Sequence, residues 1–128
     1  MVEKAKLYKP KKVEGVKKYN ARKNRDKLYD HDWFKYRDRF LKANPKCYSC
    51  GQKSTVVDHL VAHKGDIELF EKLDNHLPLC KKCHDTITAR FDKDWTPEKF
   101  EQKLYFLSAM RIKHSVSTSV KVLGRYRL

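Results

Sequence analysis

The sequence contains no apolar run that approaches the ~20 residues needed to cross a membrane as a helix. Its first residues, MVEKAKLYKPKK, include no apolar segment of the kind found in a secretory signal peptide. These two absences predict a cytoplasmic, intracellular protein that has no membrane partner. In such a reducing compartment, paired cysteines are expected to bind metal rather than to form disulfides.

Acidic and apolar residues are both in short supply. Aspartate and glutamate number 16 against 30 lysines and arginines, which gives a net charge of +14. This excess favours a nucleic acid as the partner, ahead of an acidic membrane surface or a merely soluble basic protein. Hydrophobic residues make up 40% of the chain, below the usual ~45–50%. A core of this size needs a further cross-link, which a bound metal or disulfides can supply.

The 128 residues divide into three predicted parts. Residues 1–30 form a basic N-terminal arm, residues 31–92 the central domain, and residues 93–128 a C-terminal helix with a basic tail. Apolar residues in the arm are sparse and lack a helical period, so the arm has little tendency to fold alone. Its cations suit contacts with DNA phosphates, although a solubilising tail is the alternative. They include Arg22, Lys23 and Arg25.

Helical and extended patterns alternate in the central domain and predict an α+β fold with flanking helices. Residues 31–43 have a helical aromatic stripe, assigned to the core rather than to base stacking, and Asn44-Pro45 ends this helix. Residues 55–61 are β-branched and apolar, as is typical of a strand. Residues 76–79 are extended, and Pro78 limits them to an edge strand. Further helices are expected at 67–73, at 81–91 and from Pro97 onward.

Four cysteines stand in two Cys-x-x-Cys pairs that lie about thirty residues apart: Cys47, Cys50, Cys80 and Cys83. Each pair can hold one side of a tetrahedral zinc ion through thiolates at ~2.3 Å. Because all four positions are cysteine, no coordination site is left open for chemistry. We therefore expect a structural Zn²⁺, with a redox motif or a chance arrangement as the alternative.

Between the two cysteine pairs lies Asp58-His59, and His84 directly follows the last cysteine. Neutral histidine suits a general base near pH 7. A carboxylate and an imidazole can hold a divalent cation that keeps positions open for water and phosphate. Consecutive strand residues point to opposite faces. Asp58 and His59 therefore meet at one centre only through a bulge or a strand end, or else act on metal and water from two sides.

The order and spacing of these residues resemble the HNH (His-Asn-His) endonuclease family, in particular the small HNH nucleases of phage genomes. The resemblance covers roughly residues 30–92. The matching residues are Cys47, Cys50, Val57-Asp58-His59, His63-Lys64-Gly65-Asp66, Leu69-Phe70, Asn75, Leu79-Cys80, Cys83-His84-Asp85 and Thr88-Ala89. The helix before them matches through Trp33, Arg37, Phe40-Leu41 and Asn44-Pro45.

The resemblance implies a small ββα-metal (His-Me finger) core, stapled by the four-cysteine zinc, and a one-metal mechanism. His59 corresponds to the general base that activates water, and Asn75 to the residue that orients this base. Asp58 and His84 correspond to the ligands of a catalytic divalent metal such as Mg²⁺ or Mn²⁺. In this assignment Asp58 serves the metal while His59 serves the water.

The chain departs from the family pattern in two places. After Leu69-Phe70 it has Glu71 and Lys72, where the family often has an aromatic and an acidic residue. The family often has a lysine three residues after the position of His84, where this sequence has Ile87. Lys64 and Arg90 are candidates to make the phosphate contact instead. His63 is a candidate for touching the phosphate or for supporting the site, against an ordinary loop histidine. No chemical role is assigned to His31, His76 and His114.

The function implied is a metal-dependent endonuclease that hydrolyses DNA. The main alternative is a non-catalytic zinc-finger module that binds DNA or RNA, and a third reading is a nuclease-like accessory that a partner must activate. The zinc-finger alternative needs the cysteines and the basic arm, whereas only the nuclease needs the set formed by Asp58, His59, Asn75 and His84. The phage relatives imply DNA packaging beside a terminase, in the host cytoplasm, with homing and restriction as other roles.

Overall fold

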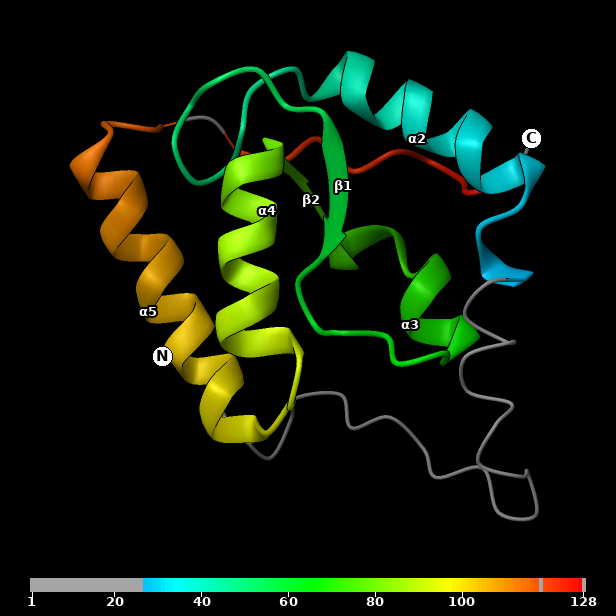
Figure 1. Cartoon of the computed structure of the whole chain (residues 1–128). Coiled ribbons are helices and arrows are strands. Elements are labelled where there is room, and N and C mark those ends of the chain that lie inside the picture. The colour runs from blue at the N-terminus through cyan, green and yellow to red at the C-terminus, as the bar shows by residue number, and fades with distance from the viewer. Residues whose placement is uncertain (1–26, 118, 128) are drawn as a thin grey trace.

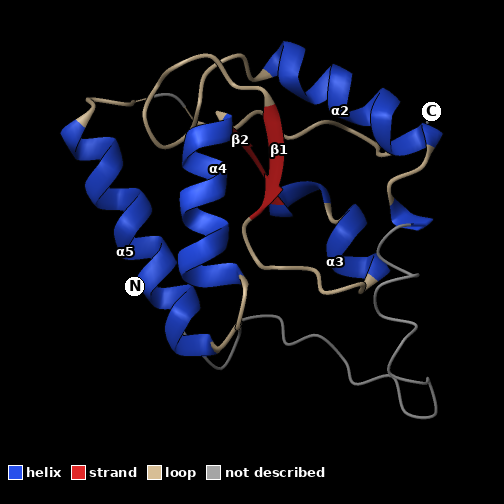
Figure 2. Cartoon of the chain, in the orientation of Figure 1, coloured by secondary structure: helices blue, strands red, loops and turns tan. Residues whose placement is uncertain are grey.

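A two-stranded antiparallel sheet occupies the centre of the computed structural model, which describes residues 27–117 and 119–127 (Figure 1). Its strands are β1 (Val56–His59) and β2 (His76–Leu79). Figure 2 shows that the rest of the described chain is helix and loop. The predicted α+β class is confirmed in this form: a small sheet, helices around it and a cluster of four cysteines.

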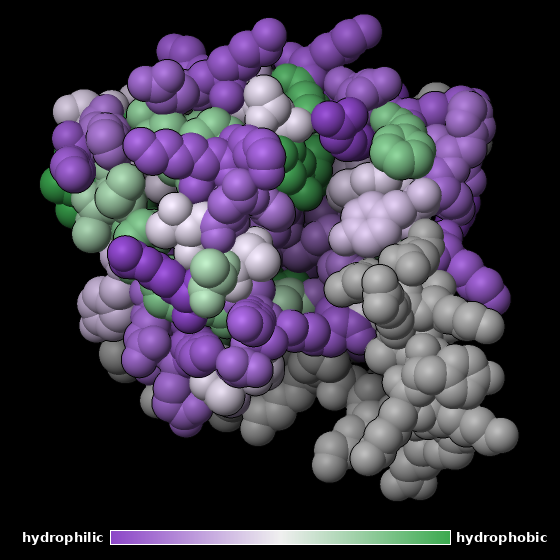
Figure 3. All heavy atoms as spheres, viewed as in Figure 1, coloured by the Kyte–Doolittle hydropathy of each residue, from purple (hydrophilic) through white to green (hydrophobic). Residues whose placement is uncertain are grey.

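Helices cover the sheet. Both α2 (His31–Ala43) and α4 (Lys81–Ile87) pack against β1, and Figure 1 shows β1 between them. Helix α5 (Pro97–Lys113) lies beside α4 and contacts its C-terminal continuation. Most of the surface on this side of the molecule is hydrophilic, with small hydrophobic patches (Figure 3). The buried apolar residues therefore lie between the helices and the two strands.

The strand pairing places His59 opposite His76 and Val57 opposite Pro78. Proline is tolerated because each strand of a two-stranded sheet has one free edge that requires no donor. The strand that was expected over 55–61 is shorter in the structure and ends at His59. Beyond this point the side chain of Asn75 bonds to the backbone of Val61 and takes the place of a ladder partner.

Helix α2 forms as the sequence predicts. The carboxylate of Asp30 accepts a hydrogen bond of 3.0 Å from the Trp33 backbone N–H and caps the first turn. The side chains of Trp33, Tyr36 and Phe40 are buried on one face. They pack with residues from β1, α3 and the C-terminal segment in one hydrophobic cluster. The aromatic stripe is thus part of the core.

The segment between the strands folds as two short turns. Asp66 caps α3 (Ile67–Glu71), which is shorter than the helix expected over 67–73 because the backbone becomes extended at Lys72. A 3₁₀ turn, η2 (Leu73–Asn75), follows and leads directly into β2. Asn75 therefore sits at a fixed place between this turn and the sheet, rather than in an open loop.

The helices after β2 begin where the sequence predicts them, at Lys81 and Pro97. Helix α4 continues as a wider π-helical turn, η3 (Thr88–Asp92), so that the helical stretch covers the expected 81–91. In this turn the N–H of Lys93 bonds to the carbonyl of Thr88 five residues earlier. Helix α5 starts with a cap from the Thr96 hydroxyl and with proline at its first position, as its sequence predicts.

The C-terminal segment returns to α2 (red in Figure 1). The side-chain amide of Asn44 exchanges two hydrogen bonds with the Lys121 backbone, at 2.7 and 3.0 Å. Tyr126 is buried and stacks on Tyr36 with ring centroids 5.0 Å apart. Arg127, expected in a free basic tail, bonds to the Glu71 carboxylate at 2.9 Å. This segment therefore completes the core around α2.

We predict that Tyr126→Ala lowers the free energy of unfolding by about 3 kcal/mol, because a buried aromatic ring leaves a cavity beside α2. Urea denaturation measures this change. The control is Val122→Ala in the same segment, where the side chain is 54% exposed and the expected change is within about 0.5 kcal/mol. Equal effects of the two substitutions would show that the segment is not part of the core.

Candidate functional site

The four cysteines form a compact cluster. The Sγ atoms of Cys47, Cys50, Cys80 and Cys83 all lie within 4.8 Å of one another, and all four are free thiols. The Sγ atoms of Cys50 and Cys80 are 3.7 Å apart. A tetrahedron with metal–sulfur bonds of ~2.3 Å has edges of about 3.8 Å. The cluster that the sequence predicts is present, and its dimensions are consistent with structural zinc.

The backbone positions each cysteine pair. Gly51 follows the first pair with φ of 79°, a conformation that glycine adopts without strain. The N–H of Tyr48 donates to the Pro78 carbonyl at 2.7 Å, which ties this turn to β2. The second pair begins at Cys80, which is the N-cap of α4. A metal held by both pairs would therefore fix the start of α4 against the sheet.

The thiols differ in their readiness to ionise. Burial raises the pKa of Cys50 and Cys83 above the ordinary value. Burial also acts on Cys47, but backbone N–H groups, with that of Cys50 foremost, outweigh it and lower its pKa. Four thiolates side by side need a bound cation, which a zinc ion supplies.

A cavity of about 450 Å³ lies between the end of β1, the loop that follows it, and the helical stretch formed by α4 and η3. Asp58, His59, His63, Lys64 and His84 all line it, so the fold brings these five predicted site residues together. His59 is the last residue of β1, where strict alternation ends. The pair Asp58-His59 therefore reaches one centre through a strand end, one of the arrangements expected from the sequence.

Asp58 and His84 form a candidate site for a divalent cation. The Oδ1 atom of Asp58 is 3.9 Å from Nε2 of His84. His84 Nδ1 lies 3.1 Å from the Asp85 carboxylate, to which it can donate a hydrogen bond. In the neutral ring this bond leaves the lone pair on Nε2, the nitrogen nearer to Asp58. The buried Oδ2 atom of Asp58 accepts no hydrogen bond from any described residue. A carboxylate oxygen and an imidazole nitrogen that face each other can both bind a cation, and the unbonded Oδ2 of Asp58 offers a further ligand atom.

The ring of His59 is buried with a defined tautomer. Its Nε2 is 3.1 Å from the backbone carbonyl of Phe70. A carbonyl only accepts, so Nε2 carries the proton and Nδ1 carries the lone pair. Burial, with repulsion from His76 and His63, lowers the pKa of His59 well below its ordinary value. His59 is therefore neutral near pH 7, the form that can accept a proton.

His76, which was assigned no chemical role, supports the same carbonyl. Its Nε2 donates to Phe70 at 2.7 Å, and the Tyr36 hydroxyl lies 2.5 Å from its Nδ1. Burial lowers the pKa of His76 and raises that of Tyr36. The helical stripe that places Tyr36 in the core was visible in the sequence, but its contact forty residues along the chain was not.

Asn75 acts on the backbone around His59. Its Oδ1 accepts from the Val61 N–H at 2.8 Å, and its Nδ2 donates to the carbonyls of Val61 and Leu69 at 3.0 and 3.1 Å. Its own carbonyl accepts from the N–H of Leu60 at 2.9 Å. These bonds hold the two residues that follow His59. Any orienting effect of Asn75 on the imidazole is thus transmitted through the chain.

Sequence reasoning missed a buried lysine beneath the site. Lys103 of α5 is completely buried, and its Nζ donates to the carbonyl of His59 at 2.9 Å. The same Nζ bonds to both carboxylate oxygens of Asp92, at 2.9 and 3.2 Å. Phe100, Lys103 and Leu107 follow helical spacing, and all three are buried. This spacing was the available signal, but a lysine on an apolar face is normally assigned to solvent.

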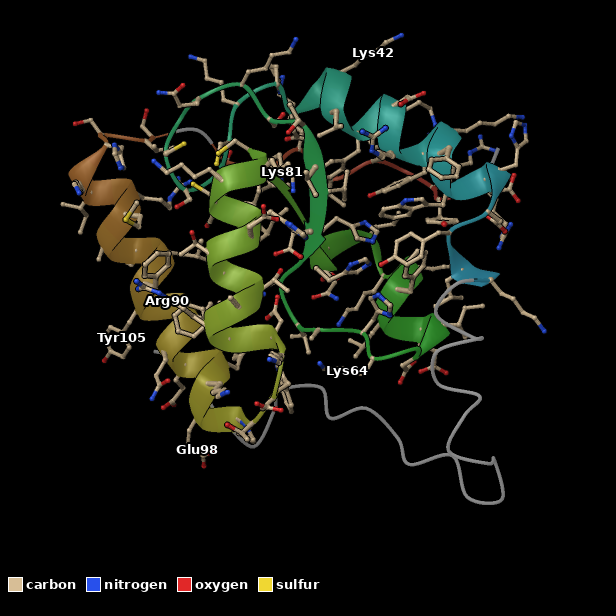
Figure 4. All side chains as sticks on the ribbon, viewed as in Figure 1. Lys42, Lys64, Lys81, Arg90, Glu98 and Tyr105 are labelled. Atoms are coloured by element: carbon tan, nitrogen blue, oxygen red, sulfur yellow. The ribbon has the colours of Figure 1, made fainter. Side chains whose placement is uncertain are left out.

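The two candidate phosphate contacts lie on different sides of α4 (Figure 4). Lys64 lines the cavity, and its ammonium group donates to the carbonyls of Asp92 and Lys93. Arg90 points toward α5 and lies over the Phe106 ring at 5.3 Å. Of these two, Lys64 is the better placed for a ligand in the cavity.

The remaining predicted residues have the following places. His63 accepts from the N–H of Gly65 at 3.0 Å and contacts the Tyr29 hydroxyl at 3.1 Å, so it is a built part of the cavity wall. Ile87 is completely buried in the core, where a lysine would have no access to the cavity. The isoleucine is therefore a packing residue. Arg22, Lys23 and Arg25 of the arm lie outside the described residues.

Comparison with known proteins found no matching family model, curated protein or solved structure. Among the described residues, no helix is long and apolar enough to cross a membrane. The inference of function therefore depends on the geometry of the site.

We predict that Cys80→Ser removes metal binding and unfolds the centre, because serine cannot supply the thiolate and the start of α4 loses its tie to the sheet. Zinc content by atomic absorption and helicity by circular dichroism measure the two effects. Ser49→Ala, at a buried neighbour that bears no thiol, serves as the control. A Cys80→Ser protein that stays folded without metal would contradict the prediction.

We further predict that acid destabilises the fold through His59 and His76. Their pKa values are lowered in the folded state, so the unfolded chain binds more protons once the pH falls below the ordinary value of 6.5. Stability present above this value is then lost by about 1.4 kcal/mol per pH unit for each histidine. Urea denaturation between about pH 7 and 5.5 measures the slope.

His76→Phe should make this slope shallower by one histidine's share, while any acid-dependent loss of metal affects both proteins alike. His31→Phe, at an exposed histidine on α2, is the matched control and should leave the slope unchanged. Identical slopes in the native protein and His76→Phe would refute the assignment.

Proposed function

We propose that this protein is a metal-dependent endonuclease of the HNH type that hydrolyses DNA phosphodiester bonds. The observation that carries the proposal is the convergence of Asp58, His59 and His84 on one cavity. Nε2 of His84 lies 3.9 Å from the Asp58 carboxylate, while Nε2 of His59 lies 3.1 Å from a backbone carbonyl. This leaves a cation site and a neutral imidazole in the same hollow.

His59 is the general base in this proposal. Its Nε2 proton is anchored on the Phe70 carbonyl, so Nδ1 is the atom that accepts a proton from water. Low polarity around the ring keeps it uncharged and ready near neutral pH. The Asn75 bonds to Val61 fix the chain immediately after His59, which limits movement of the base.

Asp58 and His84 are the ligands of a divalent cation in this proposal. Mg²⁺ or Mn²⁺ suits the carboxylate, and the imidazole also admits transition metals. When bound, the cation would polarise the phosphate and stabilise the leaving oxygen. The four-cysteine cluster has a separate duty, because its ligands are complete and it lies at the start of α4. It places His84, the residue after Cys83, over the sheet.

The charge of the chain supports DNA as the substrate. A net charge of +14 attracts a polyanion, and Lys64 stands at the cavity itself. A place in phage DNA packaging, beside a terminase, rests on the resemblance of the sequence. The rival function, a zinc module that only binds nucleic acid, has no use for the set formed by Asp58, His59 and His84.

We predict that the zinc-loaded protein cuts plasmid DNA when Mg²⁺ or Mn²⁺ is added, and that His59→Ala lowers the cleavage rate by roughly 100-fold or more. The variant should keep its zinc and its affinity for DNA, because the His59 ring is neither a zinc ligand nor one of the proposed DNA contacts. An agarose gel resolves nicked from linear product in the same assay. His114→Ala, at an exposed histidine, is the control and should cut at the native rate.

Two outcomes count against the proposal. If His59→Ala cuts DNA at the native rate, His59 is not the general base. A native protein that binds DNA but leaves it intact with every divalent metal would favour the zinc binding module instead.

A further inference from the structure

Lys103 is a buried cation that the proposed reaction does not use. It comes from α5, outside the stretch 30–92 that carries the family resemblance, and its side chain has no exposed area. Burying an ammonium group is costly unless its charge is paired and its protons are bonded. Here all of its contacts are directed at the candidate centre: the carbonyl of His59, the carboxylate of Asp92 and, at 3.9 Å, Oδ2 of Asp58.

Lys103 divides its contacts unequally between two buried carboxylates. Asp58 and Asp92 are both buried, and Asp92 also lines the cavity. Lys103 takes both carboxylate oxygens of Asp92, whereas Asp58 Oδ2 lies beyond hydrogen-bond distance. The Oδ2 atom of Asp58 is therefore left without a hydrogen bond, next to His84. Without Lys103, two buried carboxylates would compete for any cation that enters the cavity.

We infer that Lys103 is a positioning residue that shapes both halves of the centre. It holds Asp92 away from the cation, so that Asp58 and His84 alone supply the protein ligands. It also fixes the end of β1 by bonding to the carbonyl of His59, the residue whose ring is the proposed base. The second effect rests on the proposed nuclease function, while the first concerns cation binding by itself.

Packing alone does not account for a lysine at this position. Its neighbours on the same face of α5, Phe100 and Leu107, fill the core with apolar side chains. A methionine has nearly the same length and would fill the same space without burying a charge. The lysine differs from it only in the ammonium group, and the contacts of that group are those with His59, Asp92 and Asp58.

The test uses three variants in the full-length, zinc-loaded protein: Lys103→Met, Asp92→Asn, and the double variant that carries both. Removing either charge alone changes the net charge beside Asp58, whereas the double variant restores it. Lys113→Met, at an exposed lysine on the same helix, is the control. Zinc content and circular dichroism establish that each variant is folded.

Calorimetric titration with MnCl₂ at pH 8 reads out cation binding without any DNA. Lys103→Met should bind Mn²⁺ roughly tenfold more tightly or better, because a nearby positive charge is lost and Asp92 is released. Asp92→Asn should bind it more weakly, and the double variant should return to within about threefold of the native protein. His84→Ala should abolish the binding. An affinity that is unchanged or weaker in Lys103→Met overturns the inference.

The rate of plasmid cleavage at saturating Mn²⁺ tests whether Lys103 keeps His59 in the position of the proposed base. Both variants that lack Lys103 lose the bond to its carbonyl, so single-turnover rates should fall roughly tenfold or more while KM for DNA is unchanged. General damage to the fold would instead weaken cation binding and cleavage together. If Lys103→Met does not fold, the double variant decides: native-like Mn²⁺ affinity with slow cleavage supports the inference, and native-rate cleavage overturns it.

The two readouts also separate this inference from the proposed function. If the native protein binds Mn²⁺ but cuts no DNA, the nuclease proposal fails, and with it the role of Lys103 toward the base. The calorimetric series then still decides whether Lys103 keeps Asp92 out of the cation site.

Discussion

Four thiols that meet within 4.8 Å are the constraint on which the rest of the structure depends. Each strand of the sheet has only four residues, and an isolated two-stranded sheet is at best marginally stable in water. The cysteine cluster joins the turn before β1 to the first turn of α4, and so closes the chain around this sheet. Because His84 follows Cys83, the same tie sets the distance between His84 and Asp58.

Backbone carbonyls, rather than pairs of side chains, hold the residues around the cavity in place. The carbonyl of Phe70 accepts from both His59 and His76, and the carbonyl of His59 accepts from Lys103. Such acceptors cannot change protonation state, so they fix the tautomers of the imidazoles at any pH near neutrality. Asn75 adds bonds to the segment after β1. The cavity wall is therefore specified by bonds that are insensitive to the ligand.

Local signals in the sequence predicted most of the elements. Helix α2 ends before Asn44-Pro45, α5 starts at Pro97, the aromatic stripe of α2 is buried, and the four cysteines cluster. These features depend on neighbours within a few residues, or on a ligand spacing that geometry dictates. The sequence also nominated Asp58, His59 and His84, which line one cavity. Their chemical roles stay a prediction.

What the sequence did not reveal depends on contacts between distant segments. Ile87 was interpreted as a gap in the site, yet its side chain faces the core on α4. Tyr126 was part of a basic tail, yet it stacks on Tyr36 from ninety residues away. Lys103 reaches His59 across 44 residues. Burial decides each of these cases, and burial belongs to the packed chain rather than to a residue's own neighbours.

The net charge of the protein and the local contacts at its centre act over different distances, and the proposed nuclease would use both. The chain as a whole carries +14, which draws a polyanion toward it. At the cavity, Lys64 and Lys93 accompany Asp58 and Asp92, and Lys103 bonds both carboxylate oxygens of Asp92. Asp58 and His84 are therefore left as the candidate ligands of a small cation. Exposed charges are screened over ~8 Å at physiological ionic strength, whereas buried ones are screened much less. In the proposed nuclease, the charged surface would therefore gather DNA while Asp58 and His84 hold the divalent cation, because the two interactions act over different ranges.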